Sequence, residues 1–294
     1  MSEKLIETVG LKKYFKTPRG LLHAVDGVNL TISRGQTLGV VGESGCGKST
    51  LGRLLLRLIE ATEGKIIYDG QDILSLSSAG MDRIRPRMQM IFQDPYASLN
   101  PRMTVSEIIA EPIRVNKTIT NARNIDIKVN ELMETVGLAQ RFVNSYPHEL
   151  DGGRRQRIGI ARALALDPEF IVCDEPVSAL DVSIQAQVLN LLMDLQDTHG
   201  LTYLFVTHNL SVVKHISDQI MVMYLGQCVE RASSDELFEC PLHPYTRALL
   251  AAIPLPKLEA AQNAKRVVIR GEVSSPINPK PGCRFAVRCP EAVP

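Results

Sequence analysis

This sequence has almost no net charge and no long apolar run. Its 294 residues carry a formal net charge of +1, so no overall field draws the chain toward nucleic acid or anionic lipid. No apolar stretch approaches the roughly 20 residues that span a bilayer, and the start of the chain, MSEKLIETVG, lacks the apolar core of a signal peptide. We therefore expect a protein that is made and kept in the cytosol, has no nucleic-acid partner and can dock on a membrane protein.

Cysteine is scarce, and its spacing does not indicate a disulfide framework. Cys46 lies inside a glycine-rich loop and Cys173 inside an apolar run, so reduced thiols are the expected state. The remaining composition, 45% hydrophobic and 22% charged, is ordinary for a globular protein with a large core. It fits one large domain with subdivisions, or two domains. The cysteines are Cys46, Cys173, Cys228, Cys240, Cys283 and Cys289.

The sequence does contain a phosphate-binding motif. Residues 42–50 read GESGCGKST, a full match to G-x-x-x-x-G-K-[ST], between an apolar stretch and a helix-like stretch. The glycines let backbone N–H groups point at phosphate oxygens, and the following helix adds its positive end. We predict bound ATP, with Lys48 at the β- and γ-phosphates and Ser49 on Mg²⁺; a chance glycine turn is the disfavoured alternative. The other predicted contacts are Gly42, Ser44, Gly45, Cys46, Gly47 and Thr50.

Two carboxylates follow a second apolar run. Residues 170–173 are apolar throughout, as in a strand covered on both faces, and Asp174 and Glu175 come next. Such a strand delivers its last side chains to the sheet edge where α/β proteins bind ligands. Asp174 would help to hold Mg²⁺, and Glu175 would polarise the attacking water. Acidic pairs at strand ends are usually caps or turns, and it is the phosphate-binding motif that favours the catalytic interpretation.

Periodicity along the chain indicates an α/β fold. A helical period runs over about 104–165 and again over 182–196, so residues 95–165 read as a helical insertion. The last forty residues are Pro-rich, read as an appendage and contain a short strand at 267–269. The predicted strands cover 5–9, 25–32, 65–68, 88–92, 170–173, 202–206 and 219–224. Predicted core positions of the insertion are Ile108, Ile109, Val129, Leu132, Met133 and Val136.

Six motifs in a fixed order carry a resemblance to a known family. Besides the loop and the acidic strand, they are LDGGRRQR at 150–157, Gln93 in FQDP, SALD at 178–181 and His208 in VTHNL. Over about residues 4–255 the chain resembles ATP-binding-cassette (ABC) ATPases. The resemblance implies a RecA-like P-loop NTPase fold with an antiparallel β subdomain and a helical subdomain, forming an ABC ATPase domain over 1–255.

The resemblance also implies residue roles. Tyr14 matches the aromatic that stacks on adenine, and Gln93 matches the residue that touches Mg²⁺ or water and links ATP to the membrane partner. His208 matches the switch histidine at the γ-phosphate, which positions Glu175, and Asp181 matches the acid that communicates across the dimer. Each has a purely structural alternative. Tyr14 could be an aromatic of the strand core, Gln93 a polar turn residue and His208 an ordinary loop histidine.

The signature motif departs from the family pattern. In ABC proteins two cassettes close head to tail, and the L-S-G-G-Q signature of one chain completes the ATP site of the other. Here Asp151 and Arg154 replace its Ser and Gln, beside the retained Gly152 and Gly153. Because a carboxylate is repelled by a γ-phosphate, we expect slow hydrolysis at that site and a heterodimer with an unlike cassette. Alternatively Asp151 caps the following helix; both interpretations can hold together.

The C-terminal part resembles oligopeptide and dipeptide importer ATPases, in particular their second ATPase subunit. PLHPYTRALL at 241–250 and the tail motifs SPINP at 275–279 and GCRF at 282–285 carry this resemblance. It implies a paralogous second ATPase subunit, two transmembrane permease subunits, an extracytoplasmic substrate-binding protein and a place on the cytoplasmic face of the membrane. Nickel, metal-chelate or glutathione import is the alternative cargo, and a soluble ABC ATPase of DNA repair or translation is the alternative class.

The family's tail can hold a [4Fe–4S] cluster on about four thiolates. Residues 256–294 contain only Cys283 and Cys289, so we expect a truncated tail or no cluster. The alternative for this pair is two free thiols in a loose tail.

Overall fold

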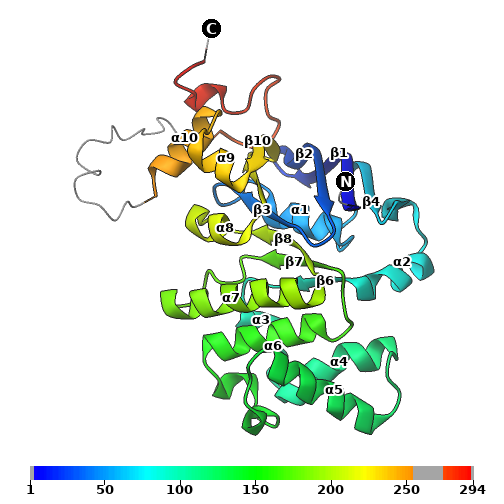
Figure 1. The fold of residues 1–294 in the computed structure, drawn as a ribbon. Coiled ribbons are helices and arrows are strands. Elements are labelled where there is room, and N and C mark those ends of the chain that lie inside the picture. Colours follow the sequence, from blue (N-terminus) through cyan, green and yellow to red (C-terminus); the bar gives the residue numbers. More distant parts are fainter. Residues whose placement is uncertain (1–2, 254–273, 293–294) are drawn as a thin grey trace, which may run out of the picture. The chain divides into compact units, whose positions relative to one another are not determined.

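The protein is described by a computed structural model over residues 3–253 and 274–292 (Figure 1). It divides into two compact units, described separately below. The first contains Met1–Ser33, Thr37–Ser75 and Phe205–Pro294, and the second contains Arg34–Gln36 and Leu76–Leu204. The predicted α/β fold is confirmed. The predicted boundary at 255 and the strand at 267–269 lie outside the described residues.

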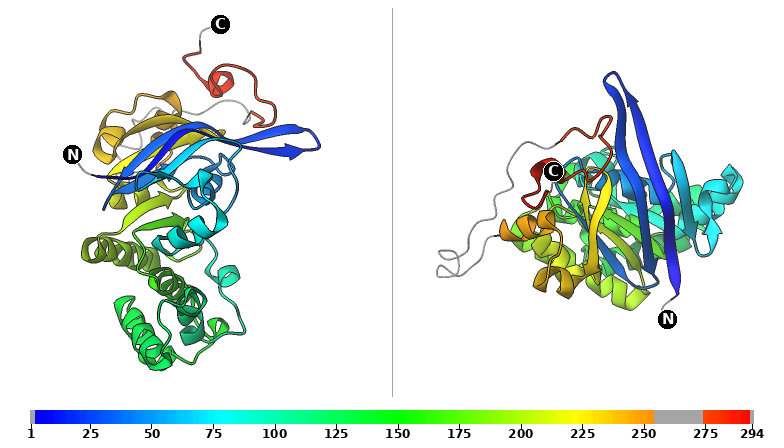
Figure 2. Two further views of the ribbon diagram at one scale, coloured as in Figure 1. Left: turned by 90° about the vertical axis from the view of Figure 1, so that its right-hand side faces the viewer. Right: turned by 90° about the horizontal axis from the view of Figure 1, so that it is seen from above.

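The first unit contains an antiparallel sheet of order β2-β1-β4-β5. Its strands β1 and β2 form a long ribbon that closes at Thr17 opposite Gly20 (Figure 2). Side chains in β2 alternate as the sequence predicted: Val28 and Leu30 are buried while Asn29 between them is exposed. Both predicted strands are confirmed, and each extends to fourteen residues. The strands are β1 Lys4–Thr17, β2 Gly20–Ser33, β4 Glu63–Tyr68 and β5 Gln71–Asp72.

The same unit contains strands in the order β10-β9-β3. β3 and β9 are parallel, and β10 returns antiparallel to β9. Every residue of β3 is buried, as expected for a parallel strand that is covered on both faces. The strands are β3 Thr37–Val41, β9 Gln219–Tyr224 and β10 Gln227–Ser233. The helices are α1 Lys48–Leu55, α8 Leu210–Ile216, α9 Ser234–Glu239 and α10 Pro244–Ala251, with one 3₁₀ turn at Ile73–Ser75 and another at Ala286–Arg288.

The second unit contains strands in the order β8-β7-β6, with β6 and β7 parallel. β8 (Thr202–Val206) ends in the first unit, and β7 is Phe170–Asp174. β6 is Met88–Ile91 and ends one residue before its predicted end. Helices α3, α4, α5 and α7 contact α6. The six predicted core positions of the insertion are all buried. The helices are α2 Ser78–Ile84, α3 Pro95–Ser98, α4 Val105–Asn116, α5 Ala122–Thr135, α6 Gly152–Leu164 and α7 Val182–His199, with 3₁₀ turns at Arg85–Arg87, Gln140–Phe142 and Pro147–Glu149.

Helix ends in the second unit follow local sequence signals. Thr104 and Glu107 form a reciprocal capping box at the start of α4. Asn121 caps α5, and Asp94 caps α3 ahead of a proline at the first helical position. These caps satisfy backbone N–H groups that have no partner within the helix.

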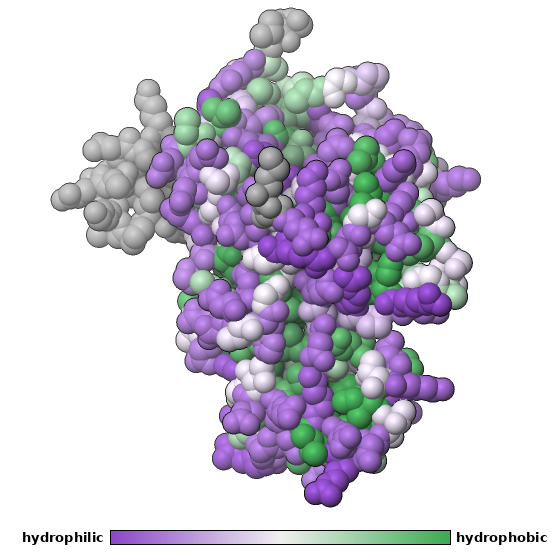
Figure 3. Space-filling model, turned by 45° about the vertical axis from the view of Figure 1, so that its right-hand side comes forward, coloured by the Kyte–Doolittle hydropathy of each residue, from purple (hydrophilic) through white to green (hydrophobic). Residues whose placement is uncertain are grey.

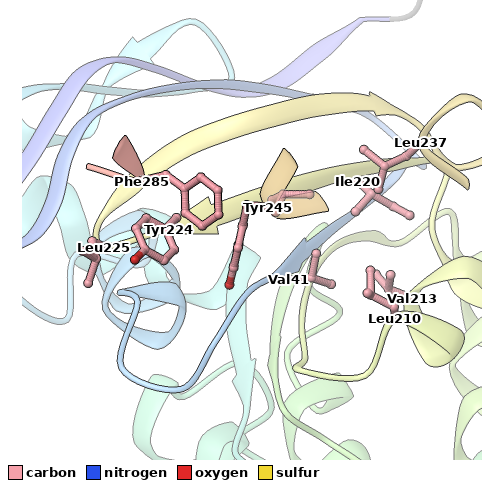
Figure 4. Packing of buried hydrophobic residues seen from close by; sticks show 10 residues of the cluster. Val41, Leu210, Val213, Ile220, Tyr224, Leu225, Leu237, Tyr245 and Phe285 are labelled. Atoms are coloured by element: carbon pink, nitrogen blue, oxygen red, sulfur yellow. The ribbon is translucent and has the colours of Figure 1, made fainter. Parts of the chain in front are cut away.

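The described tail, residues 274–292, packs against the rest of the first unit; we call it the tail strap. Its Phe285 is 1% exposed and lies in an apolar cluster with residues of β9 and α10 (Figure 4). The ring meets Tyr224 edge to face, with centroids 5.2 Å apart, and Tyr245 at 5.5 Å. Burying one such ring contributes roughly 1.5–3 kcal/mol. The loose-tail interpretation is therefore wrong for the described part of the tail.

In the view of Figure 3, hydrophilic side chains cover most of the visible surface, and apolar ones gather in small groups. Within the described ranges, no helix is both long enough and apolar enough to cross a membrane.

Candidate functional site

The glycine-rich loop joins β3 to α1 in the first unit. Gly47, the N-cap of α1, has φ 105°, and a Cβ there would lie 2.0 Å from the carbonyl oxygen of Ala24. No larger residue fits this position, because the backbone is left-handed and the approach is too close. Gly45 also has positive φ, 78°, but a Cβ there would meet nothing within 4 Å. One glycine is thus required by packing, whereas the other leaves the loop open to a ligand.

Lys48 is held over this loop. Its side chain is buried, with 5% of the residue exposed, and its Nζ donates to the carbonyls of Gly42 at 2.8 Å and Glu43 at 3.0 Å. A buried ammonium requires such partners. Ser49 and Thr50 follow in the first turn of α1, where the helix presents its positive end. The predicted phosphate-binding residues therefore lie together around one loop.

Cys46 completes the loop as a structural thiol. It is buried, and burial raises the pKa of its thiol, an effect that the nearby Lys48 ammonium partly offsets. Its carbonyl accepts a hydrogen bond from the N–H of Gly226 at 2.8 Å. This side chain packs the loop and has little thiolate character.

Tyr14 lies on β1 and is half-buried, so it is not a strand-core residue. Its ring stacks on His23 with centroids 3.9 Å apart and planes inclined by 25°. Its hydroxyl donates to Asp26 Oδ1 at 2.5 Å. Burial, followed by this hydrogen bond, raises the pKa of Tyr14. The ring is thus fixed by two partners on β2.

His208 also lies in the first unit, exposed in the turn between β8 and α8. The next residue, Asn209, caps α8 by accepting hydrogen bonds from the N–H groups of Ser211 and Val212. The cap fixes the backbone beside His208 at a helix start.

In the second unit, β7 ends at Asp174, which is 3% exposed. Glu175 follows with φ 47°, a left-handed conformation that costs a non-glycine residue about 1–2 kcal/mol. Gln93 Nε2 donates to Glu175 Oε2 at 2.9 Å, and the carbonyl of Glu175 accepts the N–H of Ser178 at 3.2 Å. The structure therefore brings together two predicted catalytic residues that are 82 positions apart in sequence.

Asp151 is the N-cap of α6. Its Oδ1 accepts the N–H of Arg154 at 2.8 Å, and its Oδ2 accepts Arg154 Nη1 at 2.8 Å. Each carboxylate oxygen thus accepts one hydrogen bond, one from the backbone and one from the guanidinium. The capping interpretation of Asp151 is confirmed. The Arg154 guanidinium also lies over the Phe142 ring, 4.9 Å from its centroid.

The signature glycines pack against the start of α7 and the residues just before it. A Cβ on Gly152 would lie 3.2 Å from Leu180 Cδ2, and one on Gly153 would lie 2.7 Å from Ile184 Cγ2. Asp181, which lies between Leu180 and Ile184 in sequence, is exposed. It is the N-cap residue of α7, but its side chain makes no capping hydrogen bond. The structure thus brings the signature beside the SALD segment within one unit.

Sequence reasoning missed the contacts that hold Glu43, the second residue of the P-loop. Its N–H donates to the Tyr245 hydroxyl at 2.9 Å. Arg288 of the tail strap, its side chain 8% exposed, donates from Nη1 to both Glu43 carboxylate oxygens at 3.2 and 3.1 Å. The only signal was that Tyr245 lies in the segment 241–250, which resembles importer ATPases, and that Arg288 closely follows the tail motif at 282–285.

Cys283 is exposed, and Cys289 is half-buried against the cluster around Phe285. No group of three or more His, Cys, Asp or Glu in the described residues could hold a metal ion. Two thiols are fewer than a [4Fe–4S] cluster requires, so the described tail does not by itself fit that cofactor.

Comparison with known proteins gives two family matches. The ABC transporter family matches residues 25–178, and the oligopeptide/dipeptide transporter C-terminal region matches residues 229–294. The oligopeptide transport ATP-binding protein OppF of Salmonella typhimurium is 53% identical over 283 residues, 96% of this chain and 85% of that protein. AppF of Bacillus subtilis, of the same description, is 52% identical over 300 residues, 99% of this chain and 91% of that protein.

Solved structures are also similar. The dimeric post-hydrolysis state of the ATP-binding cassette MJ0796, bound to ADP and Pi, has a TM-score of 0.72 and 28% identity, and covers 78% of this chain and 99% of that one. CbiO1 from Clostridium perfringens, part of the transporter complex CbiONQ, has a TM-score of 0.72 and 26% identity. The match covers 80% of this chain and 91% of that one.

Proposed function

This chain belongs to the ABC transporter family of ATPases, and we propose that it is the ATP-hydrolysing subunit that powers an importer of di- and oligopeptides. One observation carries the proposal: two proteins named as oligopeptide transport ATP-binding proteins are 52% and 53% identical to it over nearly its whole length. The matching C-terminal region favours this class over a soluble ABC ATPase of another kind.

The first unit offers the groups that an ATP substrate needs. Lys48 and the loop N–H groups would bind the β- and γ-phosphates, and His208 would contact the γ-phosphate. Tyr14 would stack on adenine through the ring face that His23 does not cover. The open space at Gly45 and the positive end of α1 support this assignment.

The predicted metal ligands fit Mg²⁺. The hydroxyl of Ser49, the amide of Gln93 and the carboxylate of Asp174 supply oxygen atoms, the donors that this ion prefers. Asp174 supports the fit because β7 delivers its carboxylate to the sheet edge where α/β proteins bind ligands. When bound, the ion neutralises charge on the phosphates.

Glu175 would act as the general base. Its carboxylate would polarise the attacking water and accept its proton. The hydrogen bond from Gln93 supports this role, because it fixes the orientation of the carboxylate. The left-handed backbone at Glu175 is of the kind that clusters at functional sites.

The partner would be a second, unlike cassette. Asp151, Gly152 and Gly153 would cover the nucleotide of that partner, and Asp181 would face the interface between cassettes. The altered signature would give one weak site, while this chain's own P-loop would be completed by the partner's signature. The two cassettes would dock on two transmembrane permease subunits at the cytoplasmic face of the membrane. An extracytoplasmic binding protein would deliver the peptide.

The test is peptide uptake into vesicles that contain the permease subunits, both cassettes and the binding protein. We expect ATP-dependent uptake of a labelled tripeptide, and no uptake with Glu175→Gln although that variant still binds ATP. The isolated chain should hydrolyse ATP slowly, because its P-loop lacks a competent signature in trans. Uptake of a nickel chelate or glutathione in place of peptide would refute the cargo. Full turnover with Glu175→Gln would refute the general base.

A further inference from the structure

The tail strap runs along the ribbon that carries Tyr14. The N–H of His23 on β2 donates to the carbonyl of Pro276 at 3.0 Å, and the N–H of Asn278 donates to the carbonyl of Leu21 at 2.9 Å. The strap thereby pairs with the start of β2, and both views of Figure 2 show it beside the ribbon. The chain's C-terminal region thus touches the element on which the adenine aromatic lies.

Besides Asn278, whose Oδ1 accepts the N–H of Leu21, the side chain of Arg284 extends from the strap toward this ribbon. It is 4% exposed, and its guanidinium donates to Asp26 Oδ2 and to the carbonyl of Leu225. Nη2 also lies 3.3 Å from Nδ1 of His23. A guanidinium remains charged at any physiological pH, so burying it requires an anion close by. Asp26 supplies that anion.

Asp26 serves two partners at once. One carboxylate oxygen accepts from Arg284 and the other accepts from the hydroxyl of Tyr14. Burial alone would raise the pKa of Asp26, but the Tyr14 hydrogen bond, the Arg284 charge and the nearby His23 together outweigh it and lower that pKa. An ionised carboxylate is a strong acceptor, so the hydroxyl of Tyr14 is bound firmly.

We propose that Arg284 is a positioning residue for the nucleotide base: it holds Asp26, which holds the hydroxyl of Tyr14 and so fixes the plane of the ring. The inference rests on the proposed function, which assigns adenine to Tyr14. A ring fixed in advance loses less freedom when a base stacks on it, so the contact gives tighter binding. The C-terminal region thereby becomes part of the nucleotide site of its own chain.

A merely structural role for Arg284 predicts a different pattern of loss. General loosening of the first unit would weaken every ligand of the P-loop. A role in positioning Tyr14 would weaken ligands that carry a base and spare inorganic tripolyphosphate, which has none. The two ligands therefore separate the explanations.

The experiment measures the dissociation constants of ATP and inorganic tripolyphosphate for the full chain by calorimetry. Base–aromatic stacking corresponds to about 5- to 150-fold in affinity, so Tyr14→Ala should weaken ATP by that order. Arg284→Met and Tyr14→Phe should each weaken ATP about three- to tenfold, and the double variant no more than either alone. Arg284→Lys should recover part of the loss. Tripolyphosphate affinity should stay unchanged in all of them.

The matched control is Arg247→Met. Like Arg284, Arg247 forms an ion pair that joins the strap to the rest of the unit: its Nη1 lies 2.9 Å from the carboxylate of Glu291 in the strap. Both of these side chains are about half exposed, and we expect the variant to have unchanged ATP affinity. Equal losses for ATP and tripolyphosphate in Arg284→Met would overturn the inference. So would unchanged ATP affinity in Arg284→Met beside a loss in Tyr14→Ala. An unchanged affinity in Tyr14→Ala itself would instead overturn the adenine assignment in the proposed function, and the inference with it.

Discussion

Replacing Asp151 separates its structural role from its electrostatic effect. In the structure, one of its oxygens caps α6 and the other binds the Arg154 guanidinium. Losing an N-cap costs about 1 kcal/mol. Losing an exposed ion pair of this spacing costs about 0.3–0.5 kcal/mol, and these side chains are 58% and 44% exposed. We expect Asp151→Ala to lower the free energy of unfolding by about 1.5 kcal/mol.

Serine is as good a cap as aspartate, so Asp151→Ser should lose only the ion pair and cost about 0.5 kcal/mol. Arg154→Gln is the matched control, because it breaks the same ion pair and leaves the cap intact. It should resemble Asp151→Ser. Circular dichroism at 222 nm suits the measurement, since the chain contains no tryptophan. A difference of 1 kcal/mol corresponds to roughly 2–4 °C in Tm for a large domain.

Equal stability of the alanine and serine variants would contradict the cap. The same variants test the electrostatic effect in the assembled transporter. Removing the carboxylate in Asp151→Ser should raise ATP turnover, since a negative charge next to a γ-phosphate is repelled. Unchanged turnover would mean that Arg154 already neutralises it, and that capping is the whole role of Asp151.

Three further outcomes follow from the described contacts. Arg288→Met should weaken both ATP and tripolyphosphate, because Arg288 holds the P-loop residue Glu43; calorimetry showing a loss for ATP alone would contradict this. Cys46 should react with iodoacetamide far more slowly than the exposed Cys240 at pH 8, since burial raises the pKa of the Cys46 thiol; peptide mapping by mass spectrometry gives both rates. Gly153→Ala should lower Tm, because its Cβ would lie 2.7 Å from an isoleucine methyl of α7, and trimming that isoleucine to alanine should restore part of the loss.

Much of the site was predictable from local sequence. The P-loop is recognisable because its glycines, lysine and flanking strand and helix are contiguous, and each is required by a backbone conformation or a charge. The acidic end of β7 is recognisable for the same reason. Periodicity also located most of the strands, though not β5 or β10, and the core of the helical insertion, since burial on a sheet or helix repeats with a fixed spacing.

Where local chemistry allowed two arrangements, the sequence left both open. Asp151 could repel a phosphate, cap a helix or do both, and only the backbone at the start of α6 shows that it caps the helix. Gln93 and Glu175 were predicted separately. Their hydrogen bond depends on β6 and β7 lying parallel and adjacent, so that both residues follow the same sheet edge.

The contacts of the tail depended on the tertiary structure alone. Arg284 and Asp26 are 258 positions apart in sequence, and Arg288 and Glu43 are 245 apart. Neither pair lies in a motif with a fixed spacing. Which acid each of these arginines meets depends on where the tail runs over the first unit. The packing of Phe285 and the backbone pairing with β2 hold the tail in that position. The sequence therefore specified the chemistry of the phosphate site, whereas the fold decided which distant residues hold it in place.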